Sequence, residues 1–239
     1  MERKSRISIL ISGQGSNLQA LIDAQTTTLK DSIIVRVGSN RKAAFGLVRA
    51  EERKIPTLYH NLVDYKKRYP DSIDQARSEY DRDLAIRLLE DNPDIIICAG
   101  FLHILAPTFL HLMAAASVPV INLHPGLPGA YNGINAIERA HKDFLDGKIN
   151  EMGIMMQVSI AFLSGPHALL IISTRHYVIS EVDMGEPILV TPIPFFKDED
   201  IEKLKDRVHG KEHEAIVTGT KIAISRLKER SSLFTNQAA

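Results

Sequence analysis

The first 150 residues show short apolar runs separated by amphipathic segments. The apolar runs cover residues 7–11, 33–37, 95–99 and 119–123, with a shorter one near residues 56–59. Runs with so few polar positions are typical of parallel strands that are covered on both faces. Between them, apolar positions recur with helical spacing in residues 18–24, 43–53, 73–90 and 134–146. We therefore expect an α/β fold, a doubly wound, mostly parallel sheet with helices on both faces.

The pattern changes after residue 150. Residues 153–180 contain almost no charge, residues 188–194 predict a strand, and residues 202–229 predict a last helix. The apolar stretch 95–121 is broken by prolines and histidines, which favours a strand, a helix and a strand over a membrane span. We expect a single domain over residues 1–239.

Composition narrows the choice of partners. Lys and Arg total 29, as do Asp and Glu, so no basic excess attracts nucleic acid or anionic lipid. The single cysteine, Cys98, excludes a disulfide within the chain and a multi-cysteine metal site. Residues 1–6 are polar and the apolar run that follows is short, so we expect no signal peptide and a cytoplasmic protein. Small molecules are the expected partners, with no nucleic acid and no membrane.

A Gly-x-Gly turn at residues 13–15 lies between the first strand and the first helix. Backbone N–H groups in such a turn can cradle a phosphate. A dinucleotide fingerprint would need glycine at position 18, which is Leu18, and an acidic residue in place of the turn at 38–40. We therefore expect a single phosphate rather than NAD, with a tight turn without ligand as the alternative. The expected phosphate ligands are the N–H groups of Gly15, Ser16 and Asn17, and Ser16 or Asn17 is the expected N-cap.

A second chemical signal lies where the apolar run 119–123 ends. Asn122 and His124 are two residues apart in an extended segment, so their side chains point to the same side. Asn122 offers a neutral amide donor, and His124 offers a side chain that titrates near neutral pH. This pair suits chemistry at a carbonyl, where an oxyanion is stabilised and a proton is moved.

Several segments together resemble one family. These segments resemble those of folate-dependent phosphoribosylglycinamide formyltransferases and occur in the same order along the chain. The matching segments are residues 11–20, 39–47, 80–82, 99–105, 122–125, 181–185 and 207–213, and residues 125–129 resemble the stand-alone fungal form.

The resemblance implies one reaction. The formyl group of 10-formyltetrahydrofolate, the co-substrate, passes to the amine of glycinamide ribonucleotide in de novo purine biosynthesis, without a metal. The implied catalytic residues are Asn122 and His124, which stabilise the charged formyl oxygen, and Asp183, which orients His124 and relays protons.

The resemblance also assigns the ligands to two parts of the domain. The phosphate-binding half covers residues 1–120 approximately, and the folate and catalytic half covers about 121–230. The implied ribonucleotide-binding residues are Gly15, Ser16, Asn17 and Glu212. The implied folate-binding residues are Leu102, His103, Ile104 and Leu105 along an apolar slot, Ile179 in the facing loop, and Arg77 near the carboxylate-bearing tail. Many members have Met-Arg where this chain has Leu102-His103.

The chain departs from the family pattern at residues 157–175. Met156 would run almost directly into His176 in that pattern, but an apolar insertion separates them. An insertion is normally a polar surface loop, so we interpret this one as a retained short intron, since a common 5′ splice sequence translates as Val-Ser. The alternative is a genuine hairpin of this lineage. The insertion interrupts a strand just before Asp183, which leaves the activity of this polypeptide open.

Three other readings remain. Methionyl-tRNA formyltransferase and formyltetrahydrofolate deformylase share the Asn-x-His and Asp core, but the first normally adds a basic C-terminal domain and the second an N-terminal regulatory domain. A third possibility is a nucleotide-binding module whose catalysis the insertion has impaired.

Overall fold

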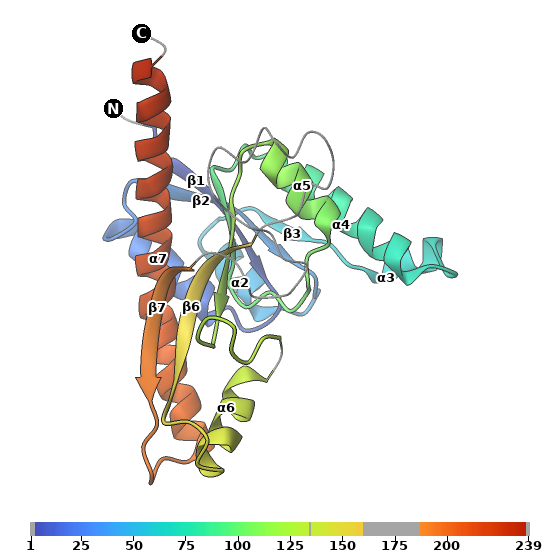
Figure 1. Cartoon of the computed structure of the whole chain (residues 1–239). Coiled ribbons are helices and arrows are strands. Elements are labelled where there is room, and N and C mark those ends of the chain that lie inside the picture. The colour runs from blue at the N-terminus through green and yellow to red at the C-terminus, as the bar shows by residue number, and fades with distance from the viewer. Residues whose placement is uncertain (1–2, 134, 160–186, 238–239) are drawn as a thin grey trace.

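The computed structural model describes residues 3–133, 135–159 and 187–237. Within them, seven strands form one sheet in the order β3-β2-β1-β4-β5-β6-β7 (Figure 1). The strands up to β5 pair in parallel, whereas β6 is antiparallel to β5 and β7 is antiparallel to β6. The strands are β1 (Ser5–Ile11), β2 (Ser32–Ser39), β3 (Thr57–Tyr59), β4 (Ile95–Cys98), β5 (Val120–His124), β6 (Glu151–Ser159) and β7 (Pro187–Pro194). The predicted mostly parallel α/β sheet is confirmed.

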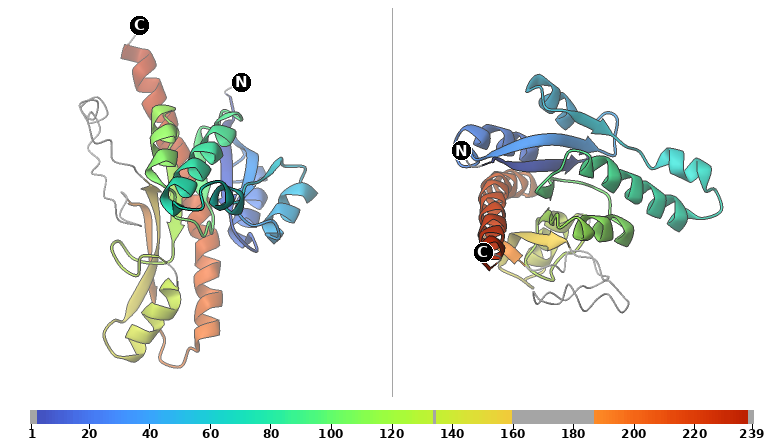
Figure 2. Two further views of the ribbon diagram at one scale, coloured as in Figure 1. Left: turned by 90° about the vertical axis from the view of Figure 1, so that its right-hand side faces the viewer. Right: turned by 90° about the horizontal axis from the view of Figure 1, so that it is seen from above.

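Helices cover both faces of the sheet. They are α1 (Ser16–Asp23), α2 (Phe45–Glu52), α3 (Val63–Arg68), α4 (Ile73–Leu89), α5 (Pro107–Ala115), α6 (Ala136–Leu145) and α7 (Ile201–Gln237), with a 3₁₀ turn η1 (Ala24–Thr26) after α1. Seen from above in Figure 2, α7 lies on one side of the sheet, and α4 and α5 lie on the other. The helix that we expected within residues 95–121 is α5.

The two sheet faces carry separate apolar cores. Ile9 and Ile11 of β1 belong to one core, together with residues of α1 and α7. Leu10 of β1 and Cys98 of β4 belong to the other, together with Tyr80 of α4 and residues of α5. This alternation along β1 is what the two-residue side-chain period of a strand requires when both faces are buried.

Local signals explain where α4 begins and ends. The Ser72 side chain caps its first turn by accepting a hydrogen bond from the backbone N–H of Gln75 at 3.2 Å. After its last turn, Asn92 adopts a left-handed conformation with φ of 46° and Pro93 follows, which prevents another turn. The predicted end of this helix at Asn92-Pro93 is confirmed.

The last helix, α7, is longer than predicted. It continues to Gln237, eight residues past the predicted end at Glu229, and its end projects beyond the sheet in Figure 1. Gly219 allows α7 to approach β6 closely, since a Cβ there would lie 2.4 Å from the Met156 sulfur. Despite this length, no helix in the described part of the chain has the apolar content that a membrane span requires.

Candidate active site

Three loops meet at the carboxyl edge of the parallel strands and are tied together by Ser12. This buried side chain, directly after β1, donates a hydrogen bond to Asn40 Oδ1 at 2.7 Å. It also accepts one from the backbone N–H of Leu102 at 2.7 Å, and the Ser12 N–H donates to the Gly100 carbonyl at 3.0 Å. The loops after β1, β2 and β4 are therefore fixed relative to one another at the edge where such folds bind ligands.

The glycine turn leads into α1, but its cap differs from our prediction. Gly15, with φ of 71°, is the N-cap residue; Ser16 is the first helical residue, and no side-chain capping bond forms. The expected cap at Ser16 or Asn17 is wrong because Gly15 packs on α2: a Cβ at Gly15 would lie 2.7 Å from the Gly46 Cα. Only glycine accepts both that approach and that conformation.

A small polar pocket lies beside the glycine turn. It has a volume of about 280 Å³ and is lined by Ser16, Gln19, Ala20, Asp23, Arg49 and His213. Arg49 brings positive charge to this place, and its Nε–H donates to the Gln14 carbonyl at 2.9 Å. The N-terminus of α1 and this guanidinium favour an anionic ligand, whereas Asp23 adds a negative charge to the lining.

Asn17 and Glu212, two of the expected ribonucleotide-binding residues, meet although they lie on α1 and α7. The Asn17 amide donates a hydrogen bond to the Glu212 carboxylate. Burial raises the pKa of Glu212, while the charge of His209 and the bond from Asn17 partly oppose that rise. Asn17 Oδ1 and His213 Nε2 are buried with no hydrogen-bond partner among the described residues.

Asn122 and His124 lie at the carboxyl end of β5, as predicted. Asn122 is opposite Cys98 of β4 and Gln157 of β6, so it shares a sheet face with both. His124 is 3% exposed. Its Nε2 lies 3.3 Å from the Ala130 carbonyl, so that nitrogen carries a proton which it donates.

Gly126 lies beside the same nitrogen of the His124 ring. A Cβ at Gly126 would lie 2.6 Å from His124 Nε2 and 2.5 Å from the Ala130 oxygen. The turn after β5 can therefore pack this closely against the imidazole because residue 126 has no side chain. This residue was not among the expected site residues, although the Pro125-Gly126 pair was a visible turn signal.

The segment assigned to folate presents only some of its side chains. Leu102 is 61% exposed and Ile104 is 56% exposed. His103 points inward instead, with its Nε2 2.9 Å from an Asp81 carboxylate oxygen, and Leu105 packs on the core beneath. Arg77 donates a hydrogen bond to the Ile104 carbonyl at 3.0 Å, which places it beside this segment.

The remaining predicted residues fall elsewhere. Asp183 and Ile179 lie outside the described residues, as does most of the predicted insertion. Its first residues, 157–159, lie in β6 and continue the pairing with β5.

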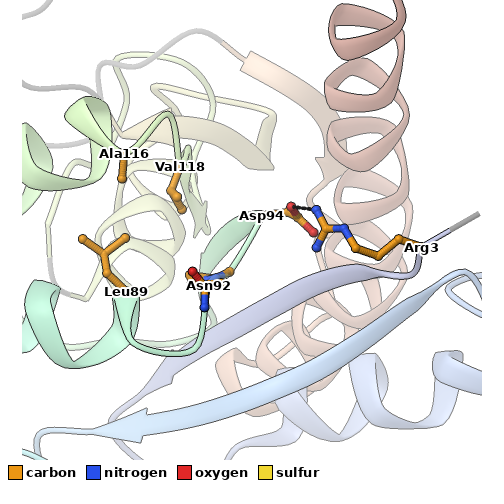
Figure 3. A pocket seen from close by; sticks show the side chains of 7 residues that line it. Arg3, Leu89, Asn92, Asp94, Ala116 and Val118 are labelled. Carbon is orange, nitrogen blue, oxygen red and sulfur yellow. Dashed lines mark hydrogen bonds and ion pairs between the residues drawn. The ribbon is translucent and has the colours of Figure 1, made fainter.

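A larger cavity in the described part of the chain is remote from these residues. It has a volume of about 520 Å³ and lies at the opposite edge of the sheet, before β1, β4 and β5 (Figure 3). Its polar feature is an exposed ion pair of 2.7 Å between Arg3 and Asp94. A pair of this kind at the surface is weak, so this cavity offers no chemistry comparable with Asn122 and His124.

Comparison with known proteins agrees with this arrangement. The family model described as formyl transferase matches residues 5–159. The phosphoribosylglycinamide formyltransferase of Schizosaccharomyces pombe is 42% identical over 211 residues, which cover 87% of this chain and 92% of that protein. The enzyme of the same name from Saccharomyces cerevisiae is 42% identical over 232 residues, covering 93% and 99%.

Solved structures give the same result. Glycinamide ribonucleotide transformylase 1 from Symbiobacterium toebii matches with a TM-score of 0.71 at 25% identity, covering 92% of this chain and 88% of that one. The sequence match, the fold and the Asn-x-His pair at the end of β5 are mutually consistent. The chain therefore belongs to the formyl transferase family, as a member of its phosphoribosylglycinamide formyltransferase branch.

Proposed function

We propose that this protein transfers the formyl group of 10-formyltetrahydrofolate to the amine of glycinamide ribonucleotide in de novo purine biosynthesis. The observation that carries the proposal is the Asn122 and His124 pair at the carboxyl end of β5, on the same edge of the sheet as the glycine turn after β1 and the exposed apolar segment after β4. The 42% identity to two enzymes named for this reaction supports it. Both substrates are small soluble molecules, in keeping with the cytoplasmic location expected from the sequence.

The proposed chemistry assigns a separate task to each catalytic residue. When the amine attacks, negative charge develops on the formyl oxygen. Asn122 donates a hydrogen bond to that oxygen, and His124 stabilises the same charge as an imidazolium or as a neutral hydrogen-bond donor. Removing one such donor typically costs about 2.7–4 kcal/mol of transition-state stabilisation. Asp183 orients His124 and passes protons through water.

The two ligands are proposed to approach from opposite faces of the sheet. Gly15, Ser16 and Asn17 hold the ribonucleotide phosphate, and Glu212 accepts hydrogen bonds from its sugar, on the face covered by α1 and α7. The folate ring lies along Leu102 and Ile104, with Arg77 near its acidic tail, beside the face covered by α4 and α5. This division follows the faces of the sheet and crosses the two halves expected from the sequence, since Leu102 and Arg77 precede residue 120 and Glu212 follows it.

The insertion determines the first experiment. The family match ends at residue 159, within the insertion, and Gln157 occupies the position opposite Asn122. We propose to purify the full chain, a variant lacking residues 157–175, and that variant with His124→Ala, and to follow formyl transfer by absorbance.

The expected result is turnover by the shortened protein, a much slower rate for the full chain, and none for the His124→Ala control. Equal activity in the first two proteins would identify residues 157–175 as a tolerated loop and keep the proposed function. If the full chain and the shortened variant both fold and bind the ribonucleotide but transfer no formyl group, the protein is a binding module and not an enzyme.

A further inference from the structure

The segment between β4 and α5 alternates between two directions. Leu102 and Ile104 are largely exposed, whereas the side chain of His103 between them is only 8% exposed. Its ring packs edge-on against Tyr80 at 5.0 Å and against Phe101 at 5.8 Å between centroids. His103 therefore faces the protein interior while its neighbours face outward.

Asp81 of α4 is the partner that holds His103 there. Its side chain is fully buried, and its carboxylate oxygens lie 2.9 and 3.1 Å from His103 Nε2, which donates to them. The same carboxylate accepts the backbone N–H of Ala106 at 2.9 Å. One buried carboxylate thus binds both the middle of the segment and its end, where α5 begins. Buried groups of this kind are costly to leave unpaired.

Besides Asp81, two side chains from outside the segment hold its backbone. Ser12 Oγ accepts the N–H of Leu102, and Arg77 donates to the carbonyl of Ile104. Both contacts are to backbone, so residues other than proline at 102 and any residue at 104 would keep them. Phe101 and Leu105 pack on the core by apolar contact, and the side chain of His103 is the one in this described segment that forms a hydrogen bond.

We propose that His103 and Asp81 are positioning residues for the folate co-substrate. They fix residues 100–106 in the shape that presents Leu102 and Ile104 outward, and the His103 side chain itself does not touch the ligand. This proposal rests on the proposed function. A surface that is ordered before binding saves the cost of ordering it at the moment of binding, so the effect belongs to folate affinity and not to the chemical step.

The test uses the full chain and three substitutions. We would measure tetrahydrofolate binding and glycinamide ribonucleotide binding by titration calorimetry, and amide hydrogen exchange across residues 100–106. We expect His103→Ala to weaken tetrahydrofolate binding about tenfold and to speed exchange in the segment, with ribonucleotide affinity within about twofold of the original. His103→Gln should recover most of the affinity, since its amide can donate to Asp81.

Leu102→Ala is the matched comparison. It removes an outward contact without disturbing the anchor, so it should weaken tetrahydrofolate binding and leave exchange unchanged. Unchanged affinity and exchange in His103→Ala would overturn the proposal and leave the function intact. Equally weakened binding of tetrahydrofolate and of the ribonucleotide, with a lowered Tm, would also overturn it, because that result would show a merely structural role for His103. No tetrahydrofolate binding by the unsubstituted chain would overturn the proposed function itself, and this inference with it.

Discussion

The glycine-turn region and the β5–β6 region differ in how their site residues are supplied. The turn after β1 is held by contacts with α2 and with the loops after β2 and β4, such as the Gly46 N–H to the Gly13 carbonyl at 3.1 Å. The end of β5 supplies Asn122 and His124, but their expected partner Asp183 comes only after the insertion. Ligand recognition and catalysis therefore depend on different parts of the sequence, and one can be lost without the other.

The largest effect is expected from substitutions of His124 and Asp183, which should lower catalysis and leave ribonucleotide binding at the glycine turn largely unchanged. His124→Ala removes the imidazole from the end of β5, and Asp183→Asn removes the carboxylate proposed to orient it. We expect each to lower kcat/KM at least about a hundredfold, in line with lost acid–base function, while ribonucleotide affinity changes little. Steady-state kinetics with calorimetric titration of the ribonucleotide measures both. Near-normal turnover in either variant would remove that residue from the mechanism.

A smaller loss is expected from Gly126→Ala. A methyl group there meets both the His124 ring and the Ala130 carbonyl at under 3 Å, so the ring or the turn must move. Displacement of a catalytic group by a fraction of an ångström lowers the rate substantially, and we expect kcat to fall about tenfold with little change in ribonucleotide KM. Gly129→Ala, where a Cβ has open space but φ is 75°, tests whether turn strain alone has that effect. Equal losses in both variants would contradict the proposed contact with His124.

On the other side of the comparison, Gly15→Ala should affect binding and spare the chemical step. Its left-handed backbone and the contact with Gly46 make a side chain there costly by about 1–3 kcal/mol, and the turn must shift to accommodate it. We expect the ribonucleotide KM to rise about tenfold while kcat stays within a few-fold. Gly13→Ala is the matched control, because a Cβ at Gly13 has no atom within 4 Å. A fall in kcat without a change in KM would place the turn outside the phosphate site.

Much of this arrangement could be predicted from the sequence because the strands are continuous apolar runs. The residues at the end of β5 followed directly, since side chains two apart in a strand share a face. The predicted end of α7 was too early because residues 230–237 contain neither Gly nor Pro to stop a helix. The short helix α3 was not predicted, since six residues are too few to show a period.

Other features depend on contacts that no local pattern records. Ser16 and Asn17 are good capping residues by type, yet Gly15 takes the cap because α2 packs against it. The inward turn of His103 depends on Asp81, 22 residues earlier on α4. The sequence around His103 does not indicate that Asp81 is its partner. Residues 80–82 resemble the family, but the resemblance assigns them no role.

The smallest effect concerns Glu212, which joins α7 to the glycine-turn region. Burial raises the pKa of Glu212 above its ordinary value of 4.5. At a pH between 4.5 and the raised pKa, Glu212 therefore keeps its proton in the folded protein but has lost it in the unfolded chain. Stability from this group is therefore complete below pH 4.5 and is lost as the pH rises through the raised pKa. Glu212→Gln mimics the protonated side chain and does not undergo this loss.

We therefore expect the Tm of Glu212→Gln, relative to that of the unsubstituted protein, to increase between pH 4.5 and pH 7. Thermal unfolding over that range measures the difference, and the added amide can also donate to the buried Asn17 Oδ1 that lacks a partner among the described residues. Glu214→Gln is the control, because Glu214 is an exposed member of an ion pair with Lys211 and its replacement should give a nearly flat difference. A flat difference for Glu212→Gln as well would mean that Glu212 is solvated in the free protein. The link between α7 and the turn would then not include a buried carboxylate.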